Sequence, residues 1–380
     1  MTGTSSRSFD AVVVGGGIAG VSAAWALARR GQRVAVVERE ASLAAHSTGR
    51  SVAQFLASYG GPASRILSAA SRPFLESGAD GLADSELLEP RNVLWVTPAG
   101  FEEQLEAKIA ANETTGTPCG RLDAAGAMEL CPVLDPRWLD AGVIEYGGFD
   151  IDVAELHQSF LRGARAEGAR VLREHGVRAL ARRDGSWQVD TGERVLSCAT
   201  VVNAAGAWAD EVARMAGAPP VGLQPYRRTV FTFASHFESA SWPLVVGADE
   251  SFYFKPEGAG QFVASPADED PVDACDVKPR EIDVAAGIEA VNRATILDVR
   301  SVRSTWAGLR TFAPDRIPVV GFDPGAPGFF WCAGQGGTGI QTSPAIASLV
   351  ADLISGEAPA SPLGSIASEL SPRRFMHSQC

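Results

Sequence analysis

The amino-acid sequence predicts an α/β protein of two domains, one of which is interrupted along the chain by the other. Three features predict this arrangement. A buried-strand pattern, a glycine-rich turn and a helix pattern follow one another in residues 11–30. The same order of strand, glycine turn and helix returns in residues 199–210. Residues 219–305 differ from both, because their short apolar runs alternate like the strands of a mainly antiparallel sheet.

The first of these units carries glycines at the spacing G-x-G-x-x-G. Ala11–Val14 is a β-branched run typical of a buried parallel strand, and Val21–Arg30 is rich in strong helix formers. Gly15 permits a tight turn, Gly17 lets a pyrophosphate approach the backbone, and Gly20 lets the helix pack closely on the strand. The first N–H groups of that helix lack partners within the helix and suit phosphate oxygens.

An acidic residue completes this βαβ unit. A second apolar run, Val34–Val37, ends at Glu38, whose carboxylate is placed to accept hydrogen bonds from ribose hydroxyls. An acid at this position argues against a 2′-phosphate. The unit therefore predicts dinucleotide binding. Its place at the beginning of the chain favours FAD, although NAD sites also begin in this way.

Composition excludes several other classes of protein. The chain has 380 residues, 46% of them hydrophobic, and a net charge of −12, which indicates a folded protein and argues against a nucleic-acid partner. Two uncharged stretches, 11–28 and 324–351, are interrupted by glycines or prolines, so we expect no integral membrane segment. Without C-x-x-C spacing or a signal peptide, we expect reduced thiols, no metal site and a cytoplasmic protein.

Helices and strands alternate along the rest of the chain. Helical spacing is clearest in residues 152–166, where acids come early and arginines late. Pro73 predicts a kink or break near the end of another helix, and residues 132–152 look like a crossing between the domains. The helices expected after the first unit are Pro62–Glu76, Phe101–Ala111, Asp152–Ala166, Arg280–Ala294 and Ala345–Ser355.

Short apolar runs predict the remaining strands, and two polar turns stand out between them. Residues 176–180 and 187–189 predict a short antiparallel meander. Residues 46–51 combine hydroxyls, a glycine and an arginine, which suits either a phosphate-binding loop or an ordinary helix cap. Residues 335–341 form a second glycine-rich turn. The other strands are expected at 94–96, 199–203, 223–233, 251–256, 261–264, 306–312, 317–321 and 328–334.

Four of these segments, taken in order, resemble the FAD-dependent D-amino acid oxidase superfamily, which includes glycine and sarcosine oxidases. They are the N-terminal glycine turn with Glu38, the loop at 46–51, the segment Val-Val-Asn-Ala-Ala-Gly-Ala-Trp at 201–208 and the glycine turn at 335–341. The likeness extends from about Phe9 to the tail at residue 371. It is strongest to D-amino acid dehydrogenases of the bacterial D-arginine dehydrogenase type.

The resemblance implies a Rossmann-type FAD-binding domain, discontinuous in sequence, and an α+β substrate domain with a mixed, mainly antiparallel sheet. The implied FAD-binding domain comprises residues 8–58, 153–218 and 306–370. The implied substrate domain comprises residues 59–152 and 219–305. Residues 1–7 and 371–380 are left as tails.

The resemblance also assigns residues to the cofactor. The N-terminal turn would hold the ADP half, the loop at 46–51 the pyrophosphate and ribityl chain, and the turn at 336–341 the flavin ring. Thr311 stands where sarcosine oxidases have a cysteine that binds flavin covalently, so we expect non-covalent FAD. The implied set is Gly15, Gly17, Ile18, Ala19, Gly20, Glu38, Arg39, Ser47, Thr48, Gly49, Arg50, Ser51, Val177, Ala205, Gly206, Trp208, Gly308, Gly336, Gly337, Thr338, Gly339, Ile340 and Gln341.

An amino-acid substrate needs its carboxylate held rigidly, and a bidentate arginine with a tyrosine hydroxyl does this well. By resemblance, the groups in these roles are Arg228, Arg310, Tyr253 and Tyr59, with the Gly337 carbonyl accepting from the amine. Arg227 and Arg228 are adjacent on an expected strand, so only one faces the site. We expect Arg227 to be a surface residue.

The side-chain pocket departs from the arginine-preferring relatives. Those enzymes have a histidine, a threonine and a glutamate where this chain has Gln54, Leu56 and Val93, and Thr338 replaces a tyrosine beside the flavin. Without the glutamate, burying a guanidinium would cost several kcal/mol of desolvation. The pocket therefore suits a neutral, apolar or aromatic side chain. Gln54 cannot take a proton, which leaves the base that deprotonates the amine unassigned.

The implied reaction is oxidation of the Cα–N bond of a D-amino acid by hydride transfer to flavin N5. The imine would hydrolyse to a 2-oxo acid and ammonia, and O₂, a quinone or another acceptor would reoxidise the flavin. Three alternatives stay open: an oxidase of an N-alkyl or cyclic amino acid in a biosynthetic pathway, a 2-hydroxy acid dehydrogenase, and a non-catalytic FAD-bearing subunit. Arg228 and Arg310 argue against the non-catalytic subunit, because such a subunit needs no residues that hold a substrate carboxylate. We call this arginine pair the carboxylate clamp.

Overall fold

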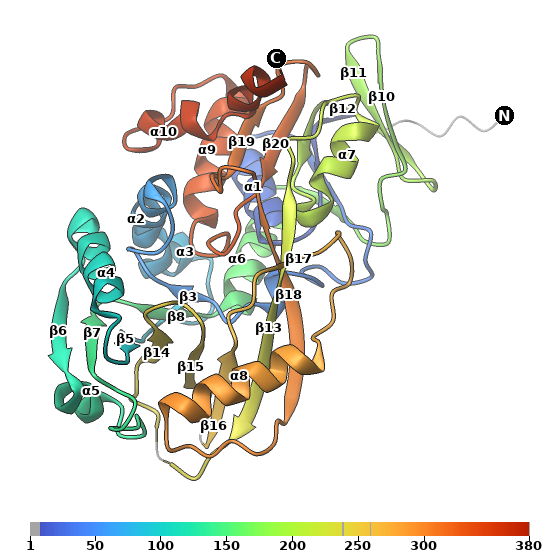
Figure 1. The fold of residues 1–380 in the computed structure, drawn as a ribbon. Coiled ribbons are helices and arrows are strands. Elements are labelled where there is room, and N and C mark those ends of the chain that lie inside the picture. Colours follow the sequence, from blue (N-terminus) through green and yellow to red (C-terminus); the bar gives the residue numbers. More distant parts are fainter. Residues whose placement is uncertain (1–7, 238, 259, 380) are drawn as a thin grey trace.

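The structure is a computed structural model that describes residues 8–237, 239–258 and 260–379. It contains two large sheets and one small sheet. Figure 1 shows the two large sheets one above the other, with strands β13 (Gln224–Ala234) and β18 (Ser304–Phe312) extending from the lower sheet toward the upper. The mixed α/β architecture predicted from the sequence is confirmed.

The first large sheet has eight strands and is built around the N-terminal unit. Its central pairings, β1 with β12, β1 with β2, β2 with β9 and β12 with β20, are all parallel, as the buried apolar runs predict. The antiparallel strands β10 and β11 form the predicted meander at one edge. The strands are β1 Ser8–Val14, β2 Val34–Val37, β9 Arg170–Leu172, β10 Ala179–Arg183, β11 Ser186–Asp190, β12 Val195–Asn203, β19 Val319–Phe322 and β20 Phe329–Ala333.

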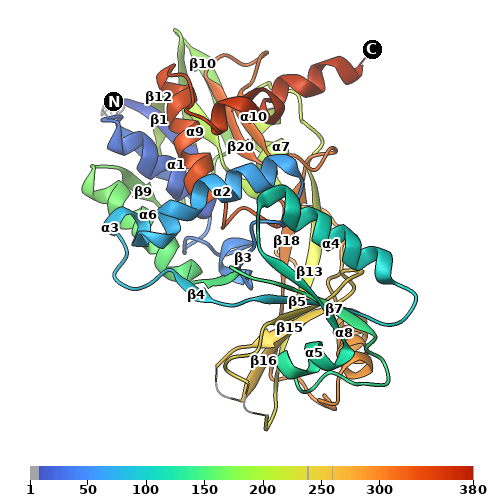
Figure 2. The same ribbon diagram turned by 90° about the vertical axis from the view of Figure 1, so that its left-hand side faces the viewer.

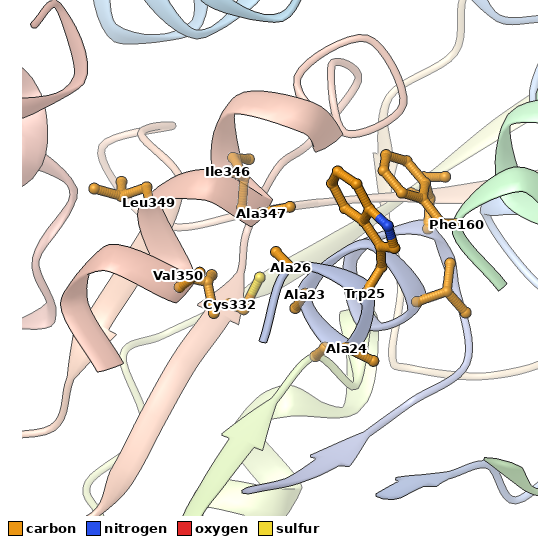
Figure 3. Close-up of a cluster of buried hydrophobic side chains, with 14 of the residues drawn as sticks. Ala23, Ala24, Trp25, Ala26, Phe160, Cys332, Ile346, Ala347, Leu349 and Val350 are labelled. Carbon is orange, nitrogen blue, oxygen red and sulfur yellow. The ribbon is translucent and has the colours of Figure 1, made fainter. Parts of the chain in front are cut away.

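Helices pack on this sheet through apolar faces. Figure 3 shows α1 (Ile18–Arg29) lying against α9 (Ser343–Ser355), with alanines of α1 facing Ile346 and Val350. Trp25 of α1 packs against Phe160 with ring centroids 5.4 Å apart. Small residues on α1 let its neighbours approach closely, so the helix is buried almost all round.

Only glycine fits where α1 meets β1. A Cβ atom on Gly20 would lie 1.9 Å from the carbonyl oxygen of Gly15, and one on Gly15 would lie 2.5 Å from the Ala204 carbonyl oxygen. Gly15 also has φ +108°, which L side chains rarely adopt. The glycine spacing therefore sets the close approach of strand, turn and helix, as expected.

The second large sheet has nine strands and is mainly antiparallel. Only β5 and β14 pair in parallel among the described strands of this sheet. A three-stranded sheet of β3 (Gln54–Phe55), β8 (Phe149–Ile151) and β4 (Leu88–Pro90) adjoins it. Besides β13 and β18, the other seven strands of this sheet are β5 Val93–Thr97, β6 Cys119–Asp123, β7 Ala141–Glu145, β14 Leu244–Gly247, β15 Tyr253–Pro256, β16 Gln261–Ser265 and β17 Asp270–Pro271.

The remaining helices cover these sheets. Figure 2 shows α2 passing near α9 and α4 leading down to the second sheet. They are α2 Pro62–Glu76, α3 Gly78–Gly81, α4 Glu102–Thr115, α5 Ala124–Leu130, α6 Val153–Ala166, α7 Ala209–Met215, α8 Glu281–Ala294 and α10 Leu363–Leu370, with 3₁₀ turns at Thr48–Arg50, Gly206–Trp208 and Pro372–Gln379. Within the described ranges, no helix is both long enough and apolar enough to cross a bilayer.

The sequence missed several short elements. Residues 132–152, expected to cross between domains, contain the strands β7 and β8, and β14 was not predicted at all. The expected break at Pro73 does not occur, because α2 continues through it to Glu76. Proline near the end of a helix removes only one backbone donor, which the short remaining turn tolerates.

A buried histidine supports the glycine turn. His157 on α6 is 3% exposed, and its Nε2 donates to the Gly16 carbonyl oxygen at 3.0 Å. Burial lowers the pKa of His157 from its ordinary value. The folded protein therefore keeps this imidazole neutral.

We expect this histidine to make folding pH-dependent. Below about pH 6.5 the imidazole of the unfolded chain gains a proton that the folded chain resists, so stability falls as pH falls, by at most about 1.4 kcal/mol per pH unit. His157→Gln keeps an N–H donor but cannot titrate. Urea denaturation at pH 5.5 and 7.5 should show a smaller loss of stability in H157Q than in the wild type. Equal losses would contradict this role.

Candidate active site

One long cavity of about 400 Å³ lies between the two large sheets. Its wall includes the β1–α1 turn and the end of β2 on one side, and β13, β14, β15 and β18 on the other. Every residue that the sequence analysis assigned to the cofactor or substrate lies on this wall, apart from Gly20, Gly49, Val93 and Thr338. The fold thus brings together segments that are far apart in the chain.

The glycine turn offers polar groups suited to a dinucleotide. Gly17 precedes α1, and the N–H of Ile18 donates to the Thr48 hydroxyl at 3.1 Å. The Glu38 carboxylate accepts from the Gly16 N–H at 2.7 Å and from the Glu40 N–H at 2.9 Å. Each carboxylate oxygen has a further lone pair for a ribose hydroxyl. These residues fit the ADP half of FAD.

Aromatic and cationic groups surround the cavity beside Glu38. The guanidinium of Arg39 lies 4.0 Å from the centroid of the Trp208 ring, and the His46 ring is 4.8 Å from the same indole. Val177 lies on the wall here, as do Ala205 and Gly206 of the turn that follows β12. His46 pairs with Glu40 at 3.0 Å, and sequence reasoning gave it no role at the site.

The loop at 46–51 is tied to β18 rather than left free. The Ser47 hydroxyl donates to the Leu309 carbonyl at 2.7 Å. Arg50 donates to the carbonyls of Val277 and Ala307 and forms an ion pair with Asp276 at 2.5 Å. The guanidinium of Arg50 is therefore already engaged within the protein, and a direct contact with phosphate stays a prediction.

The last glycine turn brings the cofactor wall against the second sheet. A Cβ atom on Gly336 would lie 2.1 Å from the Phe312 ring, and one on Gly337 would lie 3.0 Å from the Arg310 guanidinium carbon. Gly339 and Ile340 also lie on the wall. The bare backbone of this turn packs directly against Phe312 and Arg310 and borders the cavity, where it fits a flat ring such as flavin.

Register places two arginines on one face of the sheet. Arg228 on β13 pairs with Gly308 on β18, and Arg310 lies two residues further along β18. Cross-strand partners share a face, as do residues i and i+2, so Arg228 and Arg310 point to the same side as diagonal neighbours. Gly308 shares this face and adds no side chain to it; a Cβ atom there would lie 3.5 Å from the Cβ atom of Arg50.

These two cations are incompletely neutralised. Arg310 donates to the Tyr59 hydroxyl at 3.2 Å, and Arg228 donates to the Asp268 carbonyl at 2.8 Å and lies 3.5 Å from Glu269. Burial, and then the charge of Arg310, lower the pKa of Arg228. Two like charges facing one cavity favour an anion between them.

The adjoining wall is mostly apolar, though not entirely as predicted. Leu56 lies on it, held by Gln341, whose Oε1 accepts from the Leu56 N–H at 3.0 Å. Val93 is fully buried behind the wall, and Thr338 donates to the Gln335 carbonyl instead of facing the cavity. Sequence reasoning missed Trp95, Leu244, Val246 and Glu250 on this wall; the apolar run at 244–246 was the available signal.

Gln54 is on the wall and keeps an unused acceptor. Its Nε2 donates to the Arg91 carbonyl at 2.8 Å, and its buried Oε1 has no partner among the described residues. Arg91 and the buried Lys255 share the carboxylate of Asp150 behind this position. Gln54 thus borders the cavity, but its unpartnered amide oxygen is buried behind the wall.

The expected exposure of Arg227 is wrong. The residue is only 7% exposed and donates to Asp283 at 3.1 Å and to Asp270 at 2.7 Å. Alternation does turn it away from Arg228, but α8 covers that opposite face of the sheet. Asp268, Asp270 and Asp283 lie close enough together to suggest a cation site, yet Arg227 and Arg280 already provide the positive charge.

Comparisons with known proteins agree with this geometry. The profile of the family described as FAD dependent oxidoreductase matches residues 10–353. Glycerol-3-phosphate dehydrogenase 1 of Mycobacterium tuberculosis is 28% identical over 346 residues, which cover 80% of this chain and 63% of that protein. This chain therefore spans less than two thirds of the length of that relative.

Solved structures share the whole fold. Glycine oxidase from Geobacillus kaustophilus superposes with a TM-score of 0.85 at 20% identity, covering 96% of this chain and 98% of its own. L-proline dehydrogenase from P. horikoshii gives 0.83 at 22% identity, with 98% and 99% covered. The match of the family profile to residues 10–353 confirms the resemblance to the D-amino acid oxidase superfamily. The chain belongs to the family of FAD-dependent oxidoreductases.

Proposed function

We propose that this protein oxidises the Cα–N bond of a D-amino acid with a neutral, apolar or aromatic side chain. The observation that carries the proposal is the pair Arg228 and Arg310 on one face of the sheet, beside the hydroxyls of Tyr59 and Tyr253. When bound, FAD supplies an acceptor for the substrate's hydride at N5, and the resulting imine hydrolyses to a 2-oxo acid and ammonia.

The chain's own residues bind and orient the substrate. The planar guanidinium groups grip the carboxylate, and the Tyr59 hydroxyl already bonded to Arg310 fixes that arginine's position. The carbonyl of Gly337, which lies on the cavity wall, is the acceptor for the amine. A substrate held at both groups presents its Cα–H in one direction, which is the main requirement of the reaction.

The wall argues for a neutral side chain. Leu56, Leu244 and Val246 offer no hydrogen bond to a polar group. Glu250 also borders the cavity, but it forms an ion pair with Lys108, so its charge is already compensated. A cationic side chain would lose its hydration without gaining an unpaired carboxylate.

We infer that FAD binds non-covalently and that the protein works in the cytoplasm. Thr311 lies on the wall where a covalent attachment would need a cysteine thiol. The five cysteines in the described part of the chain are all free thiols, which suits a reducing compartment. Either O₂ or a quinone can accept the electrons of the reduced flavin in the proposed reaction.

A second candidate is a secondary amine such as an N-alkyl or cyclic amino acid. The solved relatives named for glycine and L-proline share the fold, and a carboxylate clamp serves both kinds of substrate equally. A 2-hydroxy acid would also fit the clamp, as would the phosphate implied by the mycobacterial relative's name. The apolar wall favours the primary amino acid with a bulky side chain.

A panel of substrates tests the proposal directly. Holoenzyme mixed anaerobically with D- and L-amino acids, N-methyl amino acids, 2-hydroxy acids and glycerol 3-phosphate is followed by flavin absorbance. We expect D-leucine, D-phenylalanine or D-tryptophan to bleach the flavin with release of ammonia, and D-arginine and D-lysine to act far more slowly. Bleaching by N-methyl or cyclic amino acids alone would move the function to the second candidate, and bleaching by primary L-amino acids alone would contradict the proposed D-configuration.

Removing one clamp charge tests the role of the arginines. We expect Arg310→Met to lower kcat/KM about 10²–10³-fold, because losing a charged partner in a desolvated site costs about 3–4 kcal/mol. Arg303→Met, an exposed arginine just before β18, serves as the matched control and should leave kcat/KM unchanged. An R310M enzyme within threefold of the wild type would rule out the clamp.

A further inference from the structure

We propose that Trp95 limits the size of the substrate side chain and that the buried carboxyl group of Glu145 fixes the position of its indole. The inference rests on the proposed function, since it concerns the same cavity. It adds a specificity-determining residue and a positioning residue, neither of which the sequence analysis identified.

Trp95 is a large side chain on the wall of the cavity. It lies on β5 between β7 and β14, is 3% exposed, and borders the cavity together with Leu244 and Val246. Val246 is its direct partner on β14. The ammonium group of Lys108 lies 4.1 Å from the centroid of the indole. With one face covered by this cation, the indole meets a substrate through its edge or its other face.

Glu145 holds the indole from behind. Its side chain is fully buried on β7, and its Oε2 accepts from Trp95 Nε1 at 3.3 Å and from Asn112 Nδ2 at 3.2 Å. Its Oε1 accepts from the Ser58 hydroxyl at 2.6 Å. These donors come from β5, α4 and the segment after β3, so one carboxyl group joins three parts of the substrate side of the molecule.

Burying a carboxyl group at this position costs free energy of desolvation. Burial raises the pKa of Glu145, and among the described residues no arginine, lysine or histidine forms an ion pair with it. An apolar residue would avoid the desolvation cost. What the carboxyl group provides instead is geometry, because three hydrogen bonds fix three side chains relative to one another.

That geometry links the side of the cavity that holds the arginines to Trp95. Ser58 precedes Tyr59, whose hydroxyl contacts Arg310 of the carboxylate clamp, and Trp95 borders the same cavity. Glu145 therefore joins the clamp side to the indole through Ser58 and Trp95. The position of the indole relative to the clamp sets how long a side chain can be.

Binding of unreactive carboxylates tests the role of Trp95. Calorimetric titration of the holoenzyme with benzoate and 2-naphthoate gives the ratio of their affinities. In Trp95→Leu we expect the ratio to shift toward 2-naphthoate by about tenfold or more, the usual effect of added pocket volume. Trp187→Leu is the matched control, since Trp187 is equally buried with one indole hydrogen bond, in the other large sheet. An unchanged ratio in W95L overturns the proposal.

Two substitutions of Glu145 test the positioning role. In Glu145→Gln the amide oxygen can accept from Trp95 and Asn112 while the amide nitrogen donates to Ser58, so we expect the wild-type ratio. In Glu145→Leu the indole loses its partner, and the ratio should shift toward that of W95L. Should E145L fail to fold, Ser58→Ala removes one of the three bonds with little change of volume and should shift the ratio the same way, by a smaller factor. Wild-type ratios in the folded E145L or in S58A would overturn the role of Glu145.

The same titrations separate this inference from the proposed function. A wild-type protein that binds neither carboxylate contradicts the clamp and therefore both proposals. If the wild-type protein binds both carboxylates and none of these substitutions changes the ratio of their affinities, only the roles of Trp95 and Glu145 are contradicted.

Discussion

The arrangement of the substrate site depends on two like charges held on one face of a sheet. Arg228 and Arg310 are diagonal neighbours on β13 and β18. Arg228 shares Glu269 with Arg316, and Arg310 has no ion pair among the described residues. Such a pair repels itself unless an anion binds. The antiparallel register of these two long strands is therefore the constraint on which the proposed binding of a carboxylate depends.

The cofactor wall and the clamp are parts of one structure. The turn at 336–341 approaches Arg310 and Phe312 so closely that only glycine fits at Gly336. Its last residue, Gln341, holds the backbone of Leu56 on the apolar wall through two hydrogen bonds. A change in the turn at 336–341 would therefore affect both Arg310 and the apolar wall at Leu56.

Much of the fold and the cofactor wall could be predicted from sequence, because glycine spacing and apolar runs are local signals. Gly15, Gly20 and Glu38 act through their immediate neighbours in a βαβ unit. The pocket wall was harder to predict. Val93 and Trp95 share one face of a strand, and which of them borders the cavity depends on the packing of β14, which is remote in sequence. Arg227 was misplaced because α8, remote in sequence, buries it.

The most direct test of the account is the structure of the FAD-bound protein with benzoate. The account predicts the carboxylate between Arg228 and Arg310, within hydrogen-bond distance of the Tyr59 hydroxyl, and the ring directed toward Trp95 and Val246. A benzoate bound elsewhere in the cavity, with the two guanidinium groups left without an anion, would contradict it.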